Sequence, residues 1–249
     1  MIDEQLLRYS RQIMLPDMDI AGQQKLVDAN VLIVGMGGLG CPVGMYLAAA
    51  GVGHLILADD DTVEITNLQR QIAHSQADIG SSKVESAAET LKGLNPKVRI
   101  TAMNQRLEEK DLDNQMATVD VVVDASDNFT TRFAINRACS KAKTPLVSGA
   151  AIRMEGQVTV FDPRDAQSPC YQCLYKEGDD ESASCSENGV LAPIVGIIGS
   201  VQALEVIKVI TGIGKSLTGR LLLLDGKTMQ WREMKLPRDE NCPVCSFSK

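Results

Sequence analysis

The amino-acid sequence predicts an α/β fold in which a doubly wound, mainly parallel sheet carries an antiparallel C-terminal extension. Three observations predict this class. A short apolar segment that begins at Val31 runs directly into the motif Gly-x-Gly-x-x-Gly at residues 35–40. Apolar, strand-like segments alternate with helix-like segments as far as residue 150, which favours parallel pairing. Beyond Met154 the segment GQVTVFDP alternates apolar and polar residues, which is typical of an antiparallel strand.

The elements around the glycine motif follow from local composition. Residues 3–14 and 19–29 are expected to form two N-terminal helices, and Val31 begins the first strand. Residues 38–50 are small and apolar, and a helix of small residues can pack closely on a sheet. The second strand covers residues 54–58 and ends in three aspartates.

The later elements continue the alternation. Ser81 or Ser82 caps a helix whose apolar stripe, from Val84 to Leu94, recurs with the helical period. Strands are then expected at residues 98–102, 119–123 and 145–148, a helix at 108–117, and a C-terminal hairpin at 219–236 with Gly226 near its turn.

The composition indicates an ordinary globular protein, because 44% of the 249 residues are hydrophobic and 23% are charged. Lys and Arg number 25 against 32 Asp and Glu, a net charge of −7. This balance argues against nucleic-acid and anionic-membrane partners, since both need a basic face. The polar start Met-Ile-Asp-Glu is unlike a signal peptide, so we expect a cytoplasmic protein.

The most apolar segment, residues 190–214, is long enough to suggest a membrane span. However, Gln202, Glu205 and Lys208 lie at three-residue steps on one face of the expected helix, and such side chains are costly in a bilayer. We therefore expect a buried helix with one polar edge.

The glycine motif and two groups of aspartates all follow expected strands, so one site at the carboxyl ends of these strands could hold them together. Asp59 follows the motif at about the interval, roughly 20 residues, at which an acidic side chain binds a nucleotide ribose. This position suits NAD or ATP equally well. The alternative is that three aspartates simply end a strand in solvent.

Two cations indicate a ligand that carries more charge than a dinucleotide. Arg70 lies in NLQRQ, among the amides Asn67, Gln69 and Gln71. Lys83 falls in the first turn of its helix, where a cation opposes the helix dipole unless an anion neutralises it. A bound phosphate would do so. The alternative is a solvated lysine at a frayed helix end.

Acidic side chains follow the fourth expected strand, in the segment DASDN. Asp124 or Asp127 could hold Mg²⁺, which nucleoside triphosphate chemistry requires and hydride transfer does not. The alternative is that Asp127-Asn128 only caps the following helix.

Four of the seven cysteines form two Cys-x-x-Cys pairs, Cys170 with Cys173 and Cys242 with Cys245. Four thiolates suit a closed, structural zinc site that pins the tail onto the body of the protein. The alternative is a redox pair, which favours a motif that opens a helix after a strand, and neither pair is expected to do so.

The other three cysteines have no partner motif. Cys185 lies in a charged stretch and is either incidental or a nucleophile. Cys41 and Cys139 fall in expected helices, where we expect them to pack.

Taken together, the motifs resemble those of the ubiquitin-activating-type adenylyltransferases of bacterial cofactor synthesis over essentially the whole chain. The resemblance is carried by GMGGLG, the aspartate run, NLQRQ, Lys83, SDN, SGAAIRMEGQ and the paired cysteine motifs. The segment SGAAIRMEGQ is similar to the molybdopterin branch of this family, whereas LADDD and DGKTMQWRE are similar to the branch that serves the thiazole of thiamin.

The resemblance implies an enzyme that binds ATP, Mg²⁺ and the C-terminal Gly-Gly tail of a small ubiquitin-like sulfur carrier. The tail carboxylate attacks the α-phosphorus, pyrophosphate leaves, and an acyl-adenylate remains for a sulfur donor. The molybdopterin branch implies the small subunit of molybdopterin synthase as carrier, and the alternative is the thiazole sulfur carrier. Because the chain ends shortly after Cys245, we expect the sulfur donor to be a separate protein.

The resemblance also implies roles for individual residues. Arg70, Lys83 and Asp127 are the expected catalytic residues, with Asp127 holding magnesium and the four paired cysteines holding zinc. Arg11 matches an arginine that reaches the nucleotide of the other subunit of a homodimer; alone it would be a solvated arginine on an amphipathic helix. Cys185 matches the family's loop cysteine, whose role differs between the branches. The expected nucleotide-binding residues are Gly35, Gly37, Gly38, Gly40, Asp59, Asp61, Thr66, Asn67, Leu68, Gln69, Arg70, Lys83, Asp127 and Asn128.

We expect residues 1–249 to form one ATP-binding adenylyltransferase domain, since no repeat, low-complexity tract or linker interrupts the chain. Its parts would be N-terminal helices at 1–30, a nucleotide-binding half at 31–150, and a carrier-binding, zinc-bearing half at 151–249.

Two other classes of function stay open. One is a nicotinamide-dependent dehydrogenase, against which stand Arg70, Lys83 and Asp127 and the lack of an evident hydride-transfer pair, since only two histidines, His54 and His74, are present. The other is a non-catalytic scaffold that binds the carrier. A tRNA-modifying relative also activates a carboxylate, but it fits the cysteine motifs and the acidic charge less well.

Overall fold

A computed structural model describes residues 2–177 and 189–246 of the chain. Within these residues one eight-stranded sheet forms the centre of the molecule, with the strand order β3-β2-β1-β4-β5-β6-β7-β8. The strands are β1 (Asn30–Val34), β2 (His54–Ala58), β3 (Arg99–Met103), β4 (Val121–Asp124), β5 (Leu146–Ile152), β6 (Glu155–Phe161), β7 (Arg220–Asp225) and β8 (Gln230–Lys235).

The first five strands pair in parallel and the last three join in antiparallel pairs, as the sequence predicts. The change of direction occurs at a tight hairpin in which Ile152 of β5 pairs with Glu155 of β6. β5 is longer than the expected 145–148 because it continues as the partner of β6. The turn between β7 and β8 begins at Gly226, as expected.

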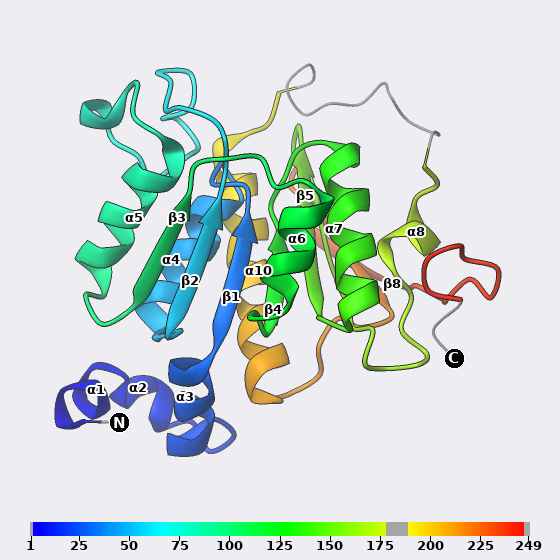
Figure 1. The fold of residues 1–249 in the computed structure, drawn as a ribbon, viewed down its shortest axis with the longest axis horizontal. Coiled ribbons are helices and arrows are strands. Elements are labelled where there is room, and N and C mark those ends of the chain that lie inside the picture. Colours follow the sequence, from blue (N-terminus) through cyan, green and yellow to red (C-terminus); the bar gives the residue numbers. More distant parts are fainter. Residues whose placement is uncertain (1, 178–188, 247–249) are drawn as a thin grey trace.

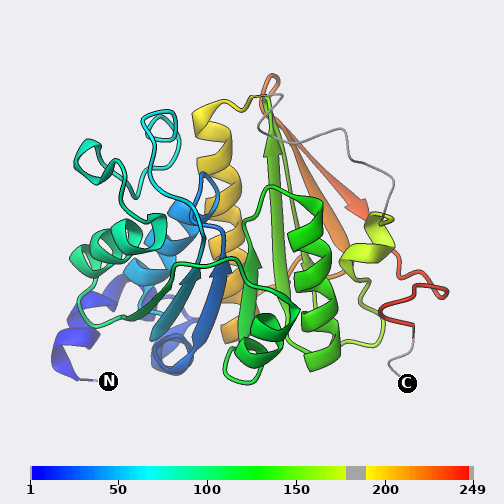
Figure 2. The ribbon, with the colours of Figure 1, turned by 45° about the horizontal axis from the view of Figure 1, so that its top comes forward.

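Helices cover both faces of the sheet (Figures 1 and 2). The helices are α1 (Asp3–Arg8), α2 (Ser10–Ile13), α3 (Asp19–Asp28), α4 (Gly40–Ala50), α5 (Lys83–Leu94), α6 (Glu109–Met116), α7 (Phe129–Ala142), α8 (Tyr171–Leu174) and α10 (Ala192–Thr211), with a 3₁₀ turn η1 (Gln76–Asp78). The two views place α6 and α7 on one face and α4 and α10 on the other. This is the doubly wound arrangement that the alternation predicts.

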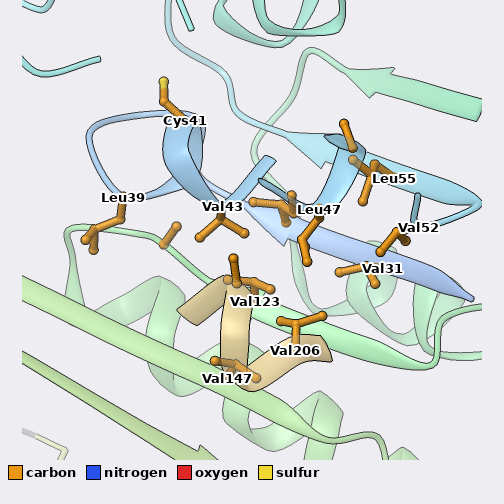
Figure 3. Packing of buried hydrophobic residues seen from close by; sticks show 14 of the residues in the cluster. Val31, Leu39, Cys41, Val43, Leu47, Val52, Leu55, Val123, Val147 and Val206 are labelled. Atoms are coloured by element: carbon orange, nitrogen blue, oxygen red, sulfur yellow. The ribbon is translucent and has the colours of Figure 1, made fainter. Parts of the chain in front are cut away.

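The core has two layers because alternate residues of each strand point to opposite faces. In β1, Val31 and Ile33 belong to the cluster under α4 and α10, whereas Leu32 and Val34 belong to the cluster under α6 and α7. Figure 3 shows the first layer, where Val43 of α4 packs toward the sheet.

The N-terminal segment differs from the expected single helix at 3–14. The helix breaks at Tyr9, which has φ −98° and ψ 11° and separates α1 from α2. Tyr9 is buried, and its hydroxyl accepts a hydrogen bond of 2.8 Å from Nδ2 of Asn95. The break thus coincides with a tertiary contact of Tyr9 that local sequence does not encode.

Among the described residues, α10 alone is long and apolar enough to cross a membrane, and half of its most apolar window is buried inside the protein. It packs against α3, α4, β5 and β6, so the expected buried helix is confirmed. Its polar edge is turned inward, however. Gln202 donates to the carbonyl of Asp124 at 2.8 Å, and Glu205 accepts from the backbone N–H of Leu217 at 2.7 Å.

Candidate functional site

A cavity of about 380 Å³ opens at the carboxyl ends of β1, β2 and β4. β1 pairs with β2 on one side and with β4 on the other, so the strand order reverses direction at β1. Doubly wound sheets bind ligands at such switch points. The volume lies in the range of small-molecule sites.

The structure brings most of the expected nucleotide-binding residues to this cavity. Those that line it are Gly35, Gly37, Gly38, Asp59, Asp61, Gln69, Arg70, Lys83, Asp127 and Asn128. Gly40, Thr66, Asn67 and Leu68 do not line it, nor does Arg11, which is exposed on α2. Cys185 lies outside the described residues.

The glycine turn at the base of the cavity requires glycine at two positions for steric reasons. Gly35 has φ +97°, and a Cβ there would lie 2.7 Å from the carbonyl oxygen of Ala125. A Cβ on Gly40 would lie 1.9 Å from the carbonyl oxygen of Gly35. Gly40 therefore serves the internal packing of the turn, whereas Gly37 and Gly38 face the cavity.

Asp59 fixes this turn to the end of β2. Its Oδ2 accepts a hydrogen bond of 2.6 Å from the backbone N–H of Met36, and its Oδ1 accepts one of 2.9 Å from that of Asp61. The alternative of an aspartate that ends a strand in solvent is therefore wrong for Asp59.

Lys83 is buried at the start of α5 and donates to Oδ2 of Asp61 at 2.7 Å. Its side chain is 7% exposed, against 65% for that of Asp61. The alternative of a solvated lysine at a frayed helix end is therefore wrong. The anion that neutralises this cation in the structure is Asp61, which the dipole argument did not foresee.

Asp127 and Asn128 have separate tasks. Asn128 caps α7, because its Oδ1 accepts from the backbone N–H of Thr131 at 2.9 Å. Asp127 is exposed and lines the cavity, and Nδ2 of Asn128 approaches its Oδ1 at 3.5 Å. The helix-cap alternative thus applies to Asn128 and leaves the Asp127 carboxylate facing the cavity.

Asp124, the other candidate for magnesium, is buried beneath the cavity. Its carboxylate accepts from the hydroxyls of Ser126 at 2.6 Å and Ser148 at 2.9 Å, and it lies 3.8 Å from Nε of Arg132. These internal partners hold Asp124 in the core, and it does not line the cavity. It supports the loop that carries Asp127.

Two cations of the cavity wall were not foreseen. Arg106 lines the cavity and lies 3.4 Å from Asp60. Arg132 lines it as well and donates to the carbonyl of Ser126 at 2.7 Å. Arg132 follows the cap residue Asn128 by one helical turn, and this spacing is the signal that could have placed it at the same end of α7.

The four paired cysteines converge on one cluster, although the two motifs are far apart in sequence. Their sulfur atoms all lie within 4.8 Å of one another, with Cys170 to Cys242 and Cys173 to Cys245 both at 3.5 Å. Four sulfurs placed around zinc at about 2.3 Å would be about 3.8 Å apart, so the cluster could hold such an ion. Cys170 does precede a short helix, α8, but residues 162–169 separate it from the end of β6, so neither pair opens a helix directly after a strand.

Hydrogen bonds to Cys173 favour the thiolate form. Its sulfur accepts from the backbone N–H groups of Cys170 and Asp239, each at 3.4 Å. The pKa of the Cys173 thiol is lowered, first by its hydrogen bond with Cys170 and further by these N–H groups. The other two described cysteines, Cys41 and Cys139, are buried, and burial raises the pKa of the Cys41 thiol to about 12.

Neither histidine lines the cavity. His54 begins β2, at the end of the strand opposite the cavity, and His74 is buried behind the glycine turn. This placement leaves neither histidine able to act as an acid–base group in the cavity.

Comparisons with known proteins extend the likeness to the whole chain. The ThiF family profile matches residues 9–244. Molybdopterin-synthase adenylyltransferase of Escherichia coli (strain K12) is 50% identical over 243 residues, which cover 98% of this chain and 97% of that protein. The sulfur carrier protein ThiS adenylyltransferase of the same strain is 46% identical over 248 residues, which cover 100% of this chain and 98% of that protein.

Among solved structures, a crystal structure of E. coli MccB with ATP is similar, with a TM-score of 0.83 and 25% identity over 96% of this chain and 73% of that chain. The profile match and the identities leave one assignment: the chain belongs to the ThiF family.

Proposed function

We propose that the chain is an adenylyltransferase that uses ATP to adenylate the C-terminal glycine of a small ubiquitin-like sulfur carrier. The observation that carries the proposal is the cavity of about 380 Å³, which a glycine turn, four cations and four aspartates, Asp127 among them, surround. The names of the two E. coli relatives support this reaction class, and the ATP in the MccB structure supports the nucleotide.

In the proposed reaction the carrier carboxylate forms a bond to the α-phosphorus of ATP, and the bond from that phosphorus to the bridging oxygen of pyrophosphate breaks. The products are a carrier acyl-adenylate and pyrophosphate. Such chemistry needs alignment and charge neutralisation more than an acid–base pair. Arg70 and Lys83 would neutralise phosphate oxygens, and the N–H groups of the glycine turn would orient them.

Asp127 would hold Mg²⁺, since its exposed carboxylate faces the cavity and hard oxygen ligands are those that Mg²⁺ prefers. The positive charge of the ion would help to neutralise the negative charge of the leaving pyrophosphate. Asp61 neutralises Lys83 in the structure, so a phosphate that binds Lys83 must share this lysine with Asp61.

We further propose that the four-cysteine cluster binds a structural zinc ion. The sulfur spacing and the N–H donors to Cys173 fit a thiolate site with no open position. Such an ion would join α8 to the C-terminal tail, away from the cavity.

The homodimer in which Arg11 reaches the nucleotide of the partner subunit stays a proposal with one structural support. Beside α2 lies an apolar groove between α4 and α10, bordered by the exposed side chains of Tyr46 and Leu204. A second copy would cover such a surface. Arg106 and Arg132 also line the cavity, so the phosphate charge does not by itself require Arg11.

We take the small subunit of molybdopterin synthase as the proposed carrier and the thiazole sulfur carrier as the alternative. ATP–pyrophosphate exchange with each purified carrier tests the choice and the function together. Exchange that depends on the molybdopterin synthase subunit supports the proposal, and exchange with the thiazole carrier alone supports the alternative. Absence of exchange with both, together with NAD binding, would refute the reaction class.

A further inference from the structure

His74 is a buried side chain that the proposed reaction does not use directly. It lies in the segment between β2 and α5, shortly after Arg70, and it is 7% exposed. It does not line the cavity. The imidazole instead lies between the glycine turn and α5: Nδ1 contacts α5, and Nε2 contacts the turn and also lies 3.7 Å from Sγ of Cys41.

The hydrogen bonds of His74 determine which nitrogen carries the proton. Nε2 lies 3.1 Å from the carbonyl oxygen of Met36, which can only accept, so Nε2 is the donor. Nδ1 lies 2.8 Å from the hydroxyl of Ser86 on α5, and in the neutral ring it accepts from that hydroxyl. Burial is the largest cause that lowers the pKa of His74, which favours the neutral ring.

The carbonyl that His74 holds belongs to the residue at the centre of the glycine turn. Met36 follows Gly35, whose φ is +97°, and precedes Gly37 and Gly38 in the cavity wall. The N–H of Met36 is fixed by Asp59 at 2.6 Å. The backbone N–H of Met36 is therefore held by Asp59 and its carbonyl by His74.

A turn rich in glycine has many accessible conformations, so its N–H groups orient a phosphate well only when other contacts fix the backbone. The thiol of Cys41 also donates to the Met36 carbonyl, at 3.4 Å, but a thiol is a weak donor. The imidazole is thus the stronger contact on this carbonyl. It also links the turn to the segment that carries Arg70.

We propose that His74 is a positioning residue for the nucleotide, because it clamps the Met36 carbonyl and so fixes the Gly37 and Gly38 backbone against the phosphates. The inference rests on the proposed use of ATP. It assigns His74 an effect on ATP and none on the carrier.

Three variants test the clamp. His74→Met removes the donor and keeps an apolar side chain in the buried space, whereas His74→Gln keeps an N–H that can reach the Met36 carbonyl. Ser86→Ala keeps the imidazole and removes the hydroxyl that orients it, together with the hydrogen bond of that hydroxyl to Asp78. His54→Gln is the matched control, since His54 begins β2 and its Nε2 contacts the Thr101 hydroxyl at 2.9 Å.

The assay is ATP–pyrophosphate exchange with the carrier saturating, supported by calorimetric titration of ATP alone. We expect His74→Met to raise the KM for ATP about tenfold, the effect of one buried hydrogen bond, at nearly constant kcat and carrier KM. His74→Gln should bring the KM for ATP back to within about threefold of wild type. Ser86→Ala should raise it about threefold, and His54→Gln should leave it unchanged.

An ATP KM that is equal in wild type, His74→Met and His74→Gln overturns the clamp. The clamp is also overturned if His74→Met and His74→Gln raise the KM for ATP and the KM for the carrier by equal factors. A merely structural role of His74 would give that result. Should His74→Met fail to fold, Ser86→Ala decides, and an unchanged ATP KM in that variant overturns the clamp. Wild-type protein that does not bind ATP overturns the proposed function, whereas wild-type binding with unchanged variants overturns only the clamp.

Discussion

Replacing Lys83 with methionine should remove most of the activity and little of the stability, and the geometry of its ion pair explains why. Lys83 and Asp61 are 2.7 Å apart, but the lysine side chain is 7% exposed and the aspartate side chain is 65% exposed. When the buried partner is removed, the remaining carboxylate returns to water. Lys83→Met should therefore change the free energy of unfolding by no more than about 1 kcal/mol, as for an exposed ion pair.

Removing Asp61 instead of Lys83 should cost more stability. Asp61→Ala leaves the Lys83 ammonium, which is only 7% exposed, without its carboxylate, and a buried donor left without its partner costs about 1–3 kcal/mol. The same ion pair should thus yield two different stability losses, according to which partner is removed. Urea unfolding of both variants measures the difference directly.

The ATP–pyrophosphate exchange activity of Lys83→Met tests the catalytic role of the lysine. Loss of a preorganised charge that stabilises a transition state costs about 10²–10³-fold in rate, so ATP–pyrophosphate exchange by Lys83→Met should fall by at least about a hundredfold. The reasoning is refuted if Lys83→Met destabilises the protein more than Asp61→Ala does. It is also refuted if Lys83→Met keeps exchange within about threefold of wild type.

Three further predictions concern the metal sites and the assembly. Purified protein should hold about one zinc per chain by metal analysis, and Cys242→Ser should lower both the zinc content and the thermal midpoint; full zinc retention would contradict the ligand set. Asp127→Ala should lower exchange by at least about a hundredfold at saturating Mg²⁺, and near-wild-type exchange would show that its carboxylate is dispensable. Arg11→Ala and Lys83→Ala should each be nearly inactive, and mixed dimers should regain part of the activity because one site is intact; no recovery despite verified subunit exchange would contradict the shared site.

The parts of the fold that depend on hydrophobic periodicity could be predicted from local sequence pattern alone. The strand at 54–58 and the start of α5 after Ser82 were predictable because alternation and helical period act over neighbouring residues, although the Ser82 side chain makes no capping hydrogen bond. The break at Tyr9 was not predictable from local pattern, and Tyr9 contacts Asn95 on a distant segment of the chain. The inward polar edge of α10 was missed for the same reason, since Gln202 finds its partner on β4.

The site shows the same division between local and tertiary information. Gly37, Asp59 and Asp127 were predicted to lie together because each follows a parallel strand, and the carboxyl ends of these strands meet at one edge of the sheet. The structure places all three around one cavity. The pairing of Lys83 with Asp61 needed the three-dimensional approach of two segments, which no local rule supplies. The convergence of the four sulfurs was predictable only because thiolate chemistry constrains them to one ion.

The transfer of label from ATP to the carrier tests the central claim most directly. The chain, Mg²⁺ and the molybdopterin synthase small subunit would be incubated in a single turnover with ATP labelled at either the α- or the γ-phosphate. The proposed adenylation predicts that α-label appears on the carrier, that γ-label leaves as pyrophosphate, and that a carrier without its terminal Gly-Gly takes up neither. Transfer of γ-label to the carrier, or no transfer to either this carrier or the thiazole carrier, would contradict it.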